Sequence, residues 1–235
     1  MSHHLDFPFP ARRALMNLGT TIDMDLLRTA FEHVPADPYQ RDFRFKSIAR
    51  VIVDGHHIIR TAPGPLYQST STNPVHGGIR RNYTELGPDD LALLAPIILM
   101  FAALGRLTAE DEILVQLQRI RANAGDDGKT GLPVVEGFHN DAAALLGLLL
   151  VQRRHVVGGC SKIARDRAGT ELVYEGVLEA GDFLLLDDRE HFHNATPIRA
   201  VTGHDDPVRD VVIITTPAAR PPEHAGGLWP GYGGS

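Results

Sequence analysis

The sequence predicts a mainly β protein, a barrel or sandwich with flanking helices. Two observations support this fold class: short apolar or β-branched runs crowd the second half of the chain, and Gly-rich or charged turns separate them. Many short strands at such spacing are typical of sandwiches and barrels. The expected strands cover residues 113–121, 134–138, 142–152, 171–178, 182–186 and 210–216.

The first half of the chain carries the flanking elements. Apolar residues at helical spacing predict a helix over residues 21–33, with Asp23 or Thr21 as its N-cap. Apolar alternation then predicts a strand over residues 43–53. The run at 142–152 is rich in Ala and Leu and would also suit a helix, but we interpret it as a strand.

The strongest helix signal covers residues 88–104. Asp89 is the expected cap and Gly105 the expected stop, while Pro96 lies inside the helix. Its apolar residues go nearly all round, which predicts a largely buried helix.

The chain has 235 residues, which allows one large domain or two small ones. No linker separates two cores, so we predict a single domain over residues 1–217. Within it, residues 1–110 support a barrel core at 111–217. Residues 218–235 are rich in Pro and Gly and form a tail.

Composition excludes several classes of partner. Hydrophobic residues make up 43% and charged residues 22%, as in soluble globular proteins. The net charge of -6 argues against nucleic acid, because phosphate binding needs a basic face. The single cysteine, Cys160, excludes an intramolecular disulfide and fits a reducing cytosol. No apolar run is long enough to span a membrane, and no secretory signal is visible, so we expect a cytoplasmic protein without a membrane partner.

A candidate metal site begins at His139-Asn140-Asp141. Residues two apart in an extended chain point to the same face, so His139 and Asp141 can face one ion. His193 follows much later, in a segment that is also expected to be extended. Two imidazoles and one carboxylate leave coordination positions open for a cosubstrate and oxygen, which is typical of non-haem Fe(II) oxygenases. We therefore predict these three residues as the catalytic metal ligands.

Arg209 strengthens this hypothesis. It precedes the last expected strand, and Thr215 shares its strand face by parity. A dicarboxylic cosubstrate that is bound to iron at one end needs a cation for its far carboxylate, and arginine supplies a permanent, bidentate one. We expect Arg209 and Thr215 to bind the cosubstrate. An isolated H-x-D pair is a chance-level pattern, so the weight rests on the joint order of H-x-D, distal histidine and arginine.

Several pieces of the chain resemble the bacterial 2-oxoglutarate/Fe(II)-dependent dioxygenase family that includes L-isoleucine 4-hydroxylase. The similar pieces lie between about residues 35 and 217, and the H-x-D and H-x-x-T-P pieces are the most specific. They are residues 37–39, 67–68, 73–80, 136–141, 158–161, 193–198 and 209–213.

This resemblance implies a double-stranded β-helix, a jelly-roll or cupin-like barrel with the metal in its mouth. It also implies Fe(II) held by His139, Asp141 and His193, 2-oxoglutarate held by Arg209, and O2 as the oxidant. The usual substrates are free amino acids, hydroxylated at an unactivated carbon with release of succinate and CO2. We expect a small-molecule substrate of this kind, and we keep a homodimer as an alternative for the oligomeric state.

Two other interpretations compete with this one. His191 and His193 share a face by parity, so either could be the distal ligand, and the following Thr196-Pro197 favours His193. A cupin-like isomerase or 2-oxoglutarate-independent oxygenase would instead use His191, His193 and His139. The other alternative is a non-catalytic barrel that binds a small molecule, because a fold does not define a function.

Substrate contacts are harder to assign. Arg119 and Arg121 share one strand face, and Gln116 and Gln118 share the other, so one of these pairs would line the pocket. The arginines would suit a substrate carboxylate, and a histidine in the Gly-containing loop over residues 67–80 would suit a lid. The candidates for substrate contact are Arg119, Arg121, His191 and His76.

Overall fold

The structure, a computed structural model, describes residues 12–40, 42–75, 77–122 and 130–221. The helices within these ranges are α1 (Met24–Thr29) and α2 (Pro88–Gly105). The strands are β1 (Arg13–Asn17), β2 (Arg44–Asp54), β3 (His57–Arg60), β4 (Thr84–Glu85), β5 (Ile113–Arg121), β6 (Leu145–Arg154), β7 (Val156–Gly158), β8 (Cys160–Ala164), β9 (Leu172–Val177), β10 (Asp182–Leu186), β11 (Phe192–Ala195), β12 (Ile198–Ala200) and β13 (Val208–Thr216).

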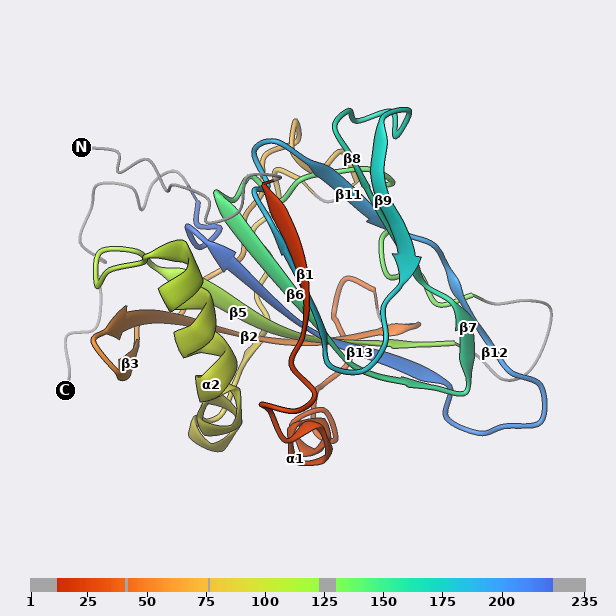
Figure 1. Cartoon of the computed structure of the whole chain (residues 1–235), viewed down its shortest axis with the longest axis horizontal. Helices are drawn as coiled ribbons and strands as arrows, with labels where there is room; N and C mark the ends of the chain where they lie inside the picture. Colours follow the sequence, from red (N-terminus) through yellow and green to blue (C-terminus); the bar gives the residue numbers. More distant parts are fainter. Residues whose placement is uncertain (1–11, 41, 76, 123–129, 222–235) are drawn as a thin grey trace.

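One large sheet dominates the fold (Figure 1). Its strand order is β1-β10-β6-β13-β5-β2-β3, and β4 adds to β2 in parallel, whereas the other ladders are antiparallel. Smaller sheets of order β11-β8-β9 and β12-β7 complete the architecture. The fold is therefore mainly β, a jelly-roll arrangement with flanking helices, as predicted.

Side chains on the large sheet alternate between two apolar clusters. In β6, Leu149 and Val151 pack with residues of α1 and α2. Leu146 and Leu150 point to the opposite face and pack with Ile163 of the three-stranded sheet. This alternation follows from the two-residue period of a strand. The second face also carries the polar pocket described below.

The helix α2 begins differently from the prediction. Its N-cap is Gly87, and Pro88 occupies the first turn, where its missing N–H costs no hydrogen bond. Asp90 accepts a hydrogen bond from Gly87 N (3.0 Å), so Asp89 is not the cap. Gly105 was expected to stop the helix, but it is the last helical residue, and the left-handed C-cap is Arg106 (φ 51°). The helix is long and apolar enough to cross a membrane, and its buried residues pack in the apolar core beside the sheet. Only 33% of it is buried, so the prediction of a largely buried helix is wrong.

The first helix is shorter than expected. The prediction covered residues 21–33, whereas α1 covers only Met24–Thr29. Asp23 is its N-cap and accepts a hydrogen bond from Leu26 N (2.9 Å). The predicted strand at 43–53 is confirmed as β2.

Most of the predicted barrel strands are confirmed. Those at 113–121, 142–152, 171–178, 182–186 and 210–216 correspond to β5, β6, β9, β10 and β13. The last of them begins at Val208, which places Arg209 inside the strand rather than before it. The short strands β1, β3, β4, β7, β8 and β12 were not predicted.

The strand predicted over residues 134–138 is wrong. Only isolated bridges flank this segment, one from Gly131 to Ile198 and one from His139 to His193. Gly137 adopts a positive φ of 77°, which interrupts extended backbone. The β-branched pair Val134-Val135 suggested a strand locally, but no neighbouring strand pairs along its length.

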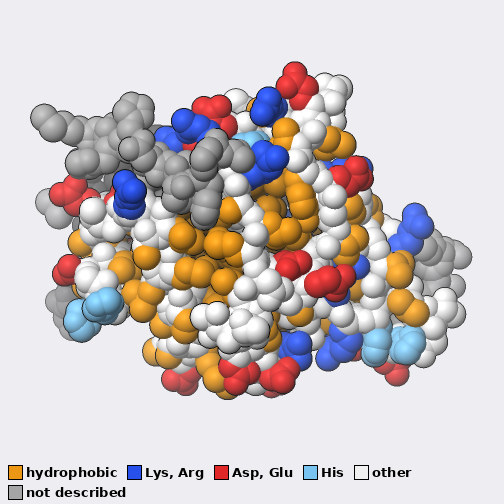
Figure 2. All heavy atoms as spheres, in the orientation of Figure 1, with side chains coloured by type: hydrophobic (Ala, Val, Ile, Leu, Met, Phe, Trp, Pro, Cys, Tyr) orange, Lys and Arg blue, Asp and Glu red, His pale blue; other side chains and the backbone are white. Residues whose placement is uncertain are grey.

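Strands from both halves of the chain share the large sheet, since β1 and β2 are hydrogen-bonded to β10 and β5. The start of the tail also packs on this unit, because Arg220 forms an ion pair with Glu112 (2.5 Å). Figure 2 shows apolar side chains gathered in the middle of one face. The edge strand β1 carries one exposed apolar side chain, Leu15, which is 48% exposed. The pocket of interest lies within the fold, between the large sheet on one side and β8, β11 and the irregular segment around His139 on the other.

Candidate metal and cosubstrate site

A backbone pairing brings the two histidines together. His139 N donates to His193 O (3.1 Å), and His193 N donates to His139 O (2.8 Å). The imidazole centroids lie 4.4 Å apart as a result. His193 belongs to β11, whereas His139 reaches this position from an irregular segment. This backbone pairing places His139 beside His193, although the two residues are far apart in the sequence.

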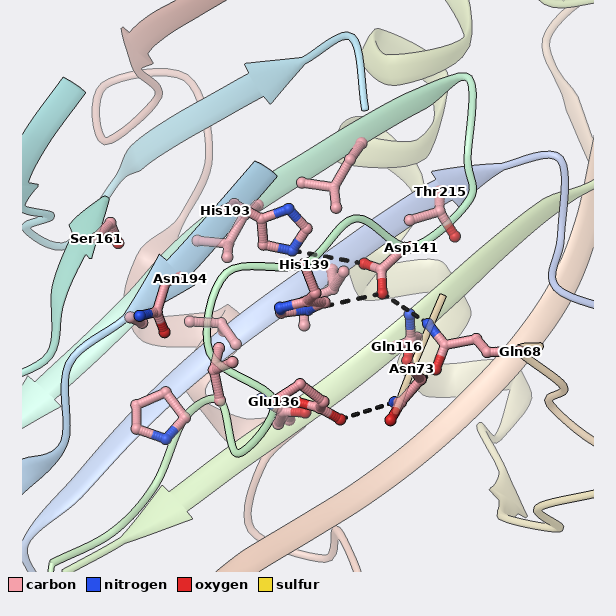
Figure 3. A pocket seen from close by; sticks show the side chains of 18 of the residues that line it. Gln68, Asn73, Gln116, Glu136, His139, Asp141, Ser161, His193, Asn194 and Thr215 are labelled. Carbon is pink, nitrogen blue, oxygen red and sulfur yellow. Dashed lines mark hydrogen bonds and ion pairs between the residues drawn. The ribbon is translucent and has the colours of Figure 1, made fainter. Parts of the chain in front are cut away.

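Asp141 completes the cluster, as Figure 3 shows. Its carboxylate oxygens lie 4.0 Å from His139 Nε2 and 3.8 Å from His193 Nε2. One potential ligand atom from each of the three residues lies within 4.8 Å of the others, and no other such group exists among the described residues. Two imidazole nitrogens and one carboxylate on one side of an ion suit Fe(II), so the donor set fits the predicted metal.

A hydrogen bond to His139 and an ion pair to His193 orient the two rings toward the ion position. His139 Nδ1 lies 2.9 Å from Gly137 O, which keeps the proton on Nδ1 and leaves Nε2 free to bind a metal. His193 Nδ1 lies 3.4 Å from Asp188 Oδ1 and has no other partner. A second group that fixes the tautomer of a metal-binding histidine is common in metalloproteins.

The electrostatics of the cluster match this arrangement. Burial and the neighbouring His193 lower the pKa of His139, so its imidazole is neutral and able to bind a metal. Burial opposes the charge of His193, but Asp188 and Asp141 outweigh it and raise the pKa of His193. Burial likewise opposes the charge of Asp141, yet His193 and His139 outweigh it and lower the pKa of Asp141. A cation between these side chains would take the place of the proton on His193.

Asp188 organises the site but was not predicted as a site residue. In the sequence it lies in the charged run Asp187-Asp188-Arg189-Glu190, which is typical of a solvated turn. It is fully buried, and its Oδ2 accepts hydrogen bonds from Asp141 N (2.7 Å) and Ala143 N (3.1 Å). The residue between these two donors, Ala142, has a positive φ of 58°, which is costly for a residue with a Cβ. Asp188 thus holds the strained turn after Asp141 and also faces His193.

We predict that Asp188→Asn weakens metal binding by about 10- to 100-fold, the range seen when outer partners of metal ligands are changed. The amide keeps the size of the side chain but removes the charge beside His193. Titration of the purified protein with Mn(II) measures the effect. Asp54→Asn, at an exposed strand end, is the control. Wild-type metal affinity in Asp188→Asn would exclude this positioning role.

The metal cluster lies at one part of an elongated pocket, and side chains of the large sheet line the rest. From β13, Arg209, Val211, Ile213 and Thr215 point into it, which agrees with the predicted parity of Arg209 and Thr215. These two residues stand six positions apart, which corresponds to roughly 20 Å along a strand. They cannot contact the same carboxylate. Thr215 lies at the metal end, because Ala144 N donates to the neighbouring Thr216 O (2.7 Å).

Arg209 is a buried cation without a hydrogen-bond or ion-pair partner among the described residues. It is 2% exposed, and its Nε and Nη2 make no hydrogen bond. Arg153 stands directly opposite on β6. Burial and this second positive charge lower the pKa of Arg209 to about 10. Gly159 permits the crowding, since a Cβ there would lie 3.3 Å from Arg209 Cδ. An anionic group placed here would offset two neighbouring charges.

Several predicted substrate contacts are not in the pocket. Gln116 and Gln118 line it, so Arg119 and Arg121 lie on the other face of β5, and their assignment is corrected. Arg119 forms a bidentate pair with buried Asp210 (2.8 Å for both contacts). Arg121 lies 3.4 Å from Asp206 Oδ1 and stacks on a ring of β2. Parity allowed either pair to face inward, and the tertiary fold selected the glutamines.

The histidine candidate His191 also lies outside the site. His191 is buried, its Nδ1 lies 3.1 Å from Asp187 O, and it belongs neither to the pocket lining nor to the metal cluster. This geometry disfavours the H-x-H site of the cupin-like alternative. His76 lies outside the described residues.

A polar network around Asp141 was not predicted as part of the site. Gln68 Nε2 donates to Asp141 Oδ1 (2.8 Å), and Gln68 Oε1 accepts from Asn73 Nδ2 (3.1 Å). Asn73 Nδ2 also donates to Glu136 Oε1 (2.7 Å), and Figure 3 shows these side chains around the pocket. Gln68, Asn73 and Glu136 all lie in pieces that carry the family resemblance, and this was the available signal.

A jelly-roll with a His-Asp-His cluster and a buried arginine in one pocket defines the class of non-haem iron oxygenases. A family model described as 2OG-Fe dioxygenase matches residues 28–215, and the chain belongs to this family. The enzymes of this family use Fe(II), 2-oxoglutarate and O2, so these are its cofactor and cosubstrates. The likeness to amino-acid hydroxylases concerns the substrate, which the family model does not define.

Solved structures show the same fold. The chain is similar to a BsmA homologue from Methylobium petroleophilum PM1 (24% identity, 84% of this chain and 83% of that chain, TM-score 0.67). It is also similar to IDO from Bacillus thuringiensis (16%, 89% and 95%, TM-score 0.72) and to the Fe(II)/α-ketoglutarate-dependent dioxygenase TqaL (15%, 87% and 82%, TM-score 0.58). No curated protein sequence matches the chain.

Proposed function

We propose that the chain hydroxylates a free L-amino acid or a close derivative, with 2-oxoglutarate converted to succinate and CO2. The observation that carries the proposal is the placement of the His139, Asp141 and His193 cluster and Arg209 in one pocket. The amino-acid class rests on the sequence pieces that resemble amino-acid hydroxylases. We also propose a cytoplasmic location, because the single cysteine fits a reducing compartment.

In this proposal His139, Asp141 and His193 hold Fe(II). Bound iron supplies the oxidation of the substrate, coupled to decarboxylation of the cosubstrate. The protein's own task is to orient the reactants and to exclude water, since the pocket walls include apolar residues of β6, β10 and β13. Asp188 holds the ring of His193, and Gln68 holds the carboxylate of Asp141.

Arg209 binds the distal carboxylate of 2-oxoglutarate in this proposal. Its buried, unpartnered nitrogens suit a bidentate contact with two carboxylate oxygens. The neighbouring Arg153 adds a second favourable charge. Thr215 lies too far along β13 to share this carboxylate, so we assign its hydroxyl to the metal end of the pocket.

A screen of the common L-amino acids with Fe(II), ascorbate and 2-oxoglutarate tests the proposal. We expect one amino acid to gain a single oxygen atom by mass spectrometry, with stoichiometric succinate. Succinate formation without any oxidised amino acid would remove the amino-acid class but keep the oxygenase. Oxygen consumption that is independent of added 2-oxoglutarate would instead support a cupin-like oxygenase.

A further inference from the structure

A second group of buried cations lies in the same pocket, apart from Arg209. Arg44 and Lys46 stand two positions apart on β2, and Arg81 closes the loop that begins at Leu66. All three line the pocket and are at most 7% exposed. Burial of charged side chains is costly unless an opposite charge or hydrogen bonds compensate it.

Compensation within the described residues is incomplete. Arg44 Nε donates to buried Asp37 (2.5 Å), but its Nη2 has no partner. Arg81 Nη2 donates to Gln68 Oε1 (2.6 Å), but its Nε has none. The ammonium of Lys46 lies over the ring of Tyr83 at 5.2 Å and makes no hydrogen bond or ion pair in the described parts of the chain.

The charge balance therefore favours an anion. Asp37 balances Arg44, Asp141 belongs to the metal cluster, and Glu136 of the pocket wall accepts from Asn73. Burial, together with Arg44 and Arg81, lowers the pKa of Lys46 to about 7, which reflects this surplus of positive charge. A carboxylate would accept hydrogen bonds from the free nitrogens and would restore the balance.

The position of the cluster fits the substrate rather than the cosubstrate. In the large sheet β5 separates β2 from β13, so Arg44 and Arg209 oppose Ile120 from its two sides. Two strand spacings place these backbones roughly 10 Å apart. Gln68 connects the cluster to the metal, since its amide accepts from Arg81 and donates to Asp141. A molecule anchored here extends from the cluster to the metal position.

We propose that Arg44, Lys46 and Arg81 form a subsite for a carboxylate group of the substrate. This inference rests on the proposed function, because it takes Arg209 as the site of the cosubstrate. It adds where the substrate carboxylate binds: beside β2, on the other side of β5 from Arg209.

The test measures ligand binding by thermal stabilisation in the presence of saturating Mn(II) and 2-oxoglutarate. The probes are the common L-amino acids and unbranched monocarboxylates from acetate to octanoate, each paired with its own primary amide. We expect at least one carboxylate to stabilise the wild-type protein while its amide does not. No preference for any carboxylate over its amide would overturn the proposal.

Two variants locate the binding. In Lys46→Met and Arg81→Gln we expect the affinity for that carboxylate to fall at least tenfold, while Arg81→Lys keeps part of it. In Lys46→Met, which removes no hydrogen bond of the Gln68 and Asp141 network, the affinity for Mn(II) and 2-oxoglutarate should change less than about twofold. Arg28→Gln, an exposed arginine of α1, controls for the loss of one positive charge.

Lys46→Met also distinguishes a loss of carboxylate binding from a loss of folding. Lys46 has no hydrogen bond to lose, so we expect the unliganded variant to melt at the wild-type temperature or above it. Unchanged carboxylate binding in both variants would overturn the subsite. A loss of 2-oxoglutarate affinity instead would assign the cluster to the cosubstrate. Failure of the wild-type protein to bind 2-oxoglutarate would count against the proposed function, not against the subsite.

Discussion

Asp141→Ala is expected to abolish 2-oxoglutarate-dependent succinate formation. Asp141 supplies the only carboxylate of the metal cluster, and both histidine Nε2 atoms lie within 4.0 Å of its oxygens. Two neutral imidazoles alone bind Fe(II) weakly, because the carboxylate provides the charge that opposes the cation. The loss of metal affinity should exceed the roughly 100-fold upper range for changes to outer partners.

Mn(II) titration and succinate assays on the same preparation separate binding from turnover. Asp54→Ala, at the exposed end of β2, is the matched control and should behave as wild type. Asp141→Ala should also remain folded, since its backbone amide keeps the bond to Asp188. Wild-type turnover by Asp141→Ala would refute the ligand assignment.

Arg209→Gln is expected to raise the KM for 2-oxoglutarate by roughly 30-fold to several-thousand-fold. These values correspond to the ~2–5 kcal/mol that the loss of one partner of a buried charge pair costs. Glutamine cannot offset the distal carboxylate, and the neighbouring Arg153 already donates to Gly158 O (2.8 Å). The metal affinity should stay unchanged, because Arg209 is not one of the three residues of the metal cluster.

The unliganded Arg209→Gln protein provides a second signature. Burial and Arg153 lower the pKa of Arg209 to about 10, so its charge opposes folding in the absence of an anion. We expect the free energy of unfolding of the variant to equal or exceed that of the wild type without 2-oxoglutarate, and to gain less when it is added. Arg199→Gln, on the exposed side of β12, is the control. An unchanged KM would move the cosubstrate carboxylate to the Arg44, Lys46 and Arg81 cluster.

Both expectations depend on a sheet whose two faces are chemically different. Toward α1 and α2, the face carries apolar residues such as Leu149 and Val151, which supply the core. The pocket face carries buried amides and also arginines, some of whose buried nitrogens have no hydrogen-bond partner. Such groups reduce stability and are therefore best explained by ligands that bind them.

The local sequence was sufficient to predict a strand and its bounds where the strand had a strong apolar pattern and turn residues at both ends. The strands at 113–121 and 182–186 were predicted with their observed bounds, because turn residues limit both. It failed at 134–138, since β-branched residues predict a strand only if a partner runs alongside. It also misplaced the cap of α2, where Pro88 rather than Asp89 marks the first turn.

By itself the sequence determined the mainly β class, the identity of the three cluster residues and the candidate cosubstrate arginine, because these depend on residue type, spacing and family resemblance. Only the tertiary structure decided that Gln116 and Gln118, not Arg119 and Arg121, face the pocket. It alone brought in Asp188 and the cations of β2 and Arg81, which lie far from the cluster in sequence. Parity allows either face of a strand to be buried, and only its packing against neighbouring elements selects one.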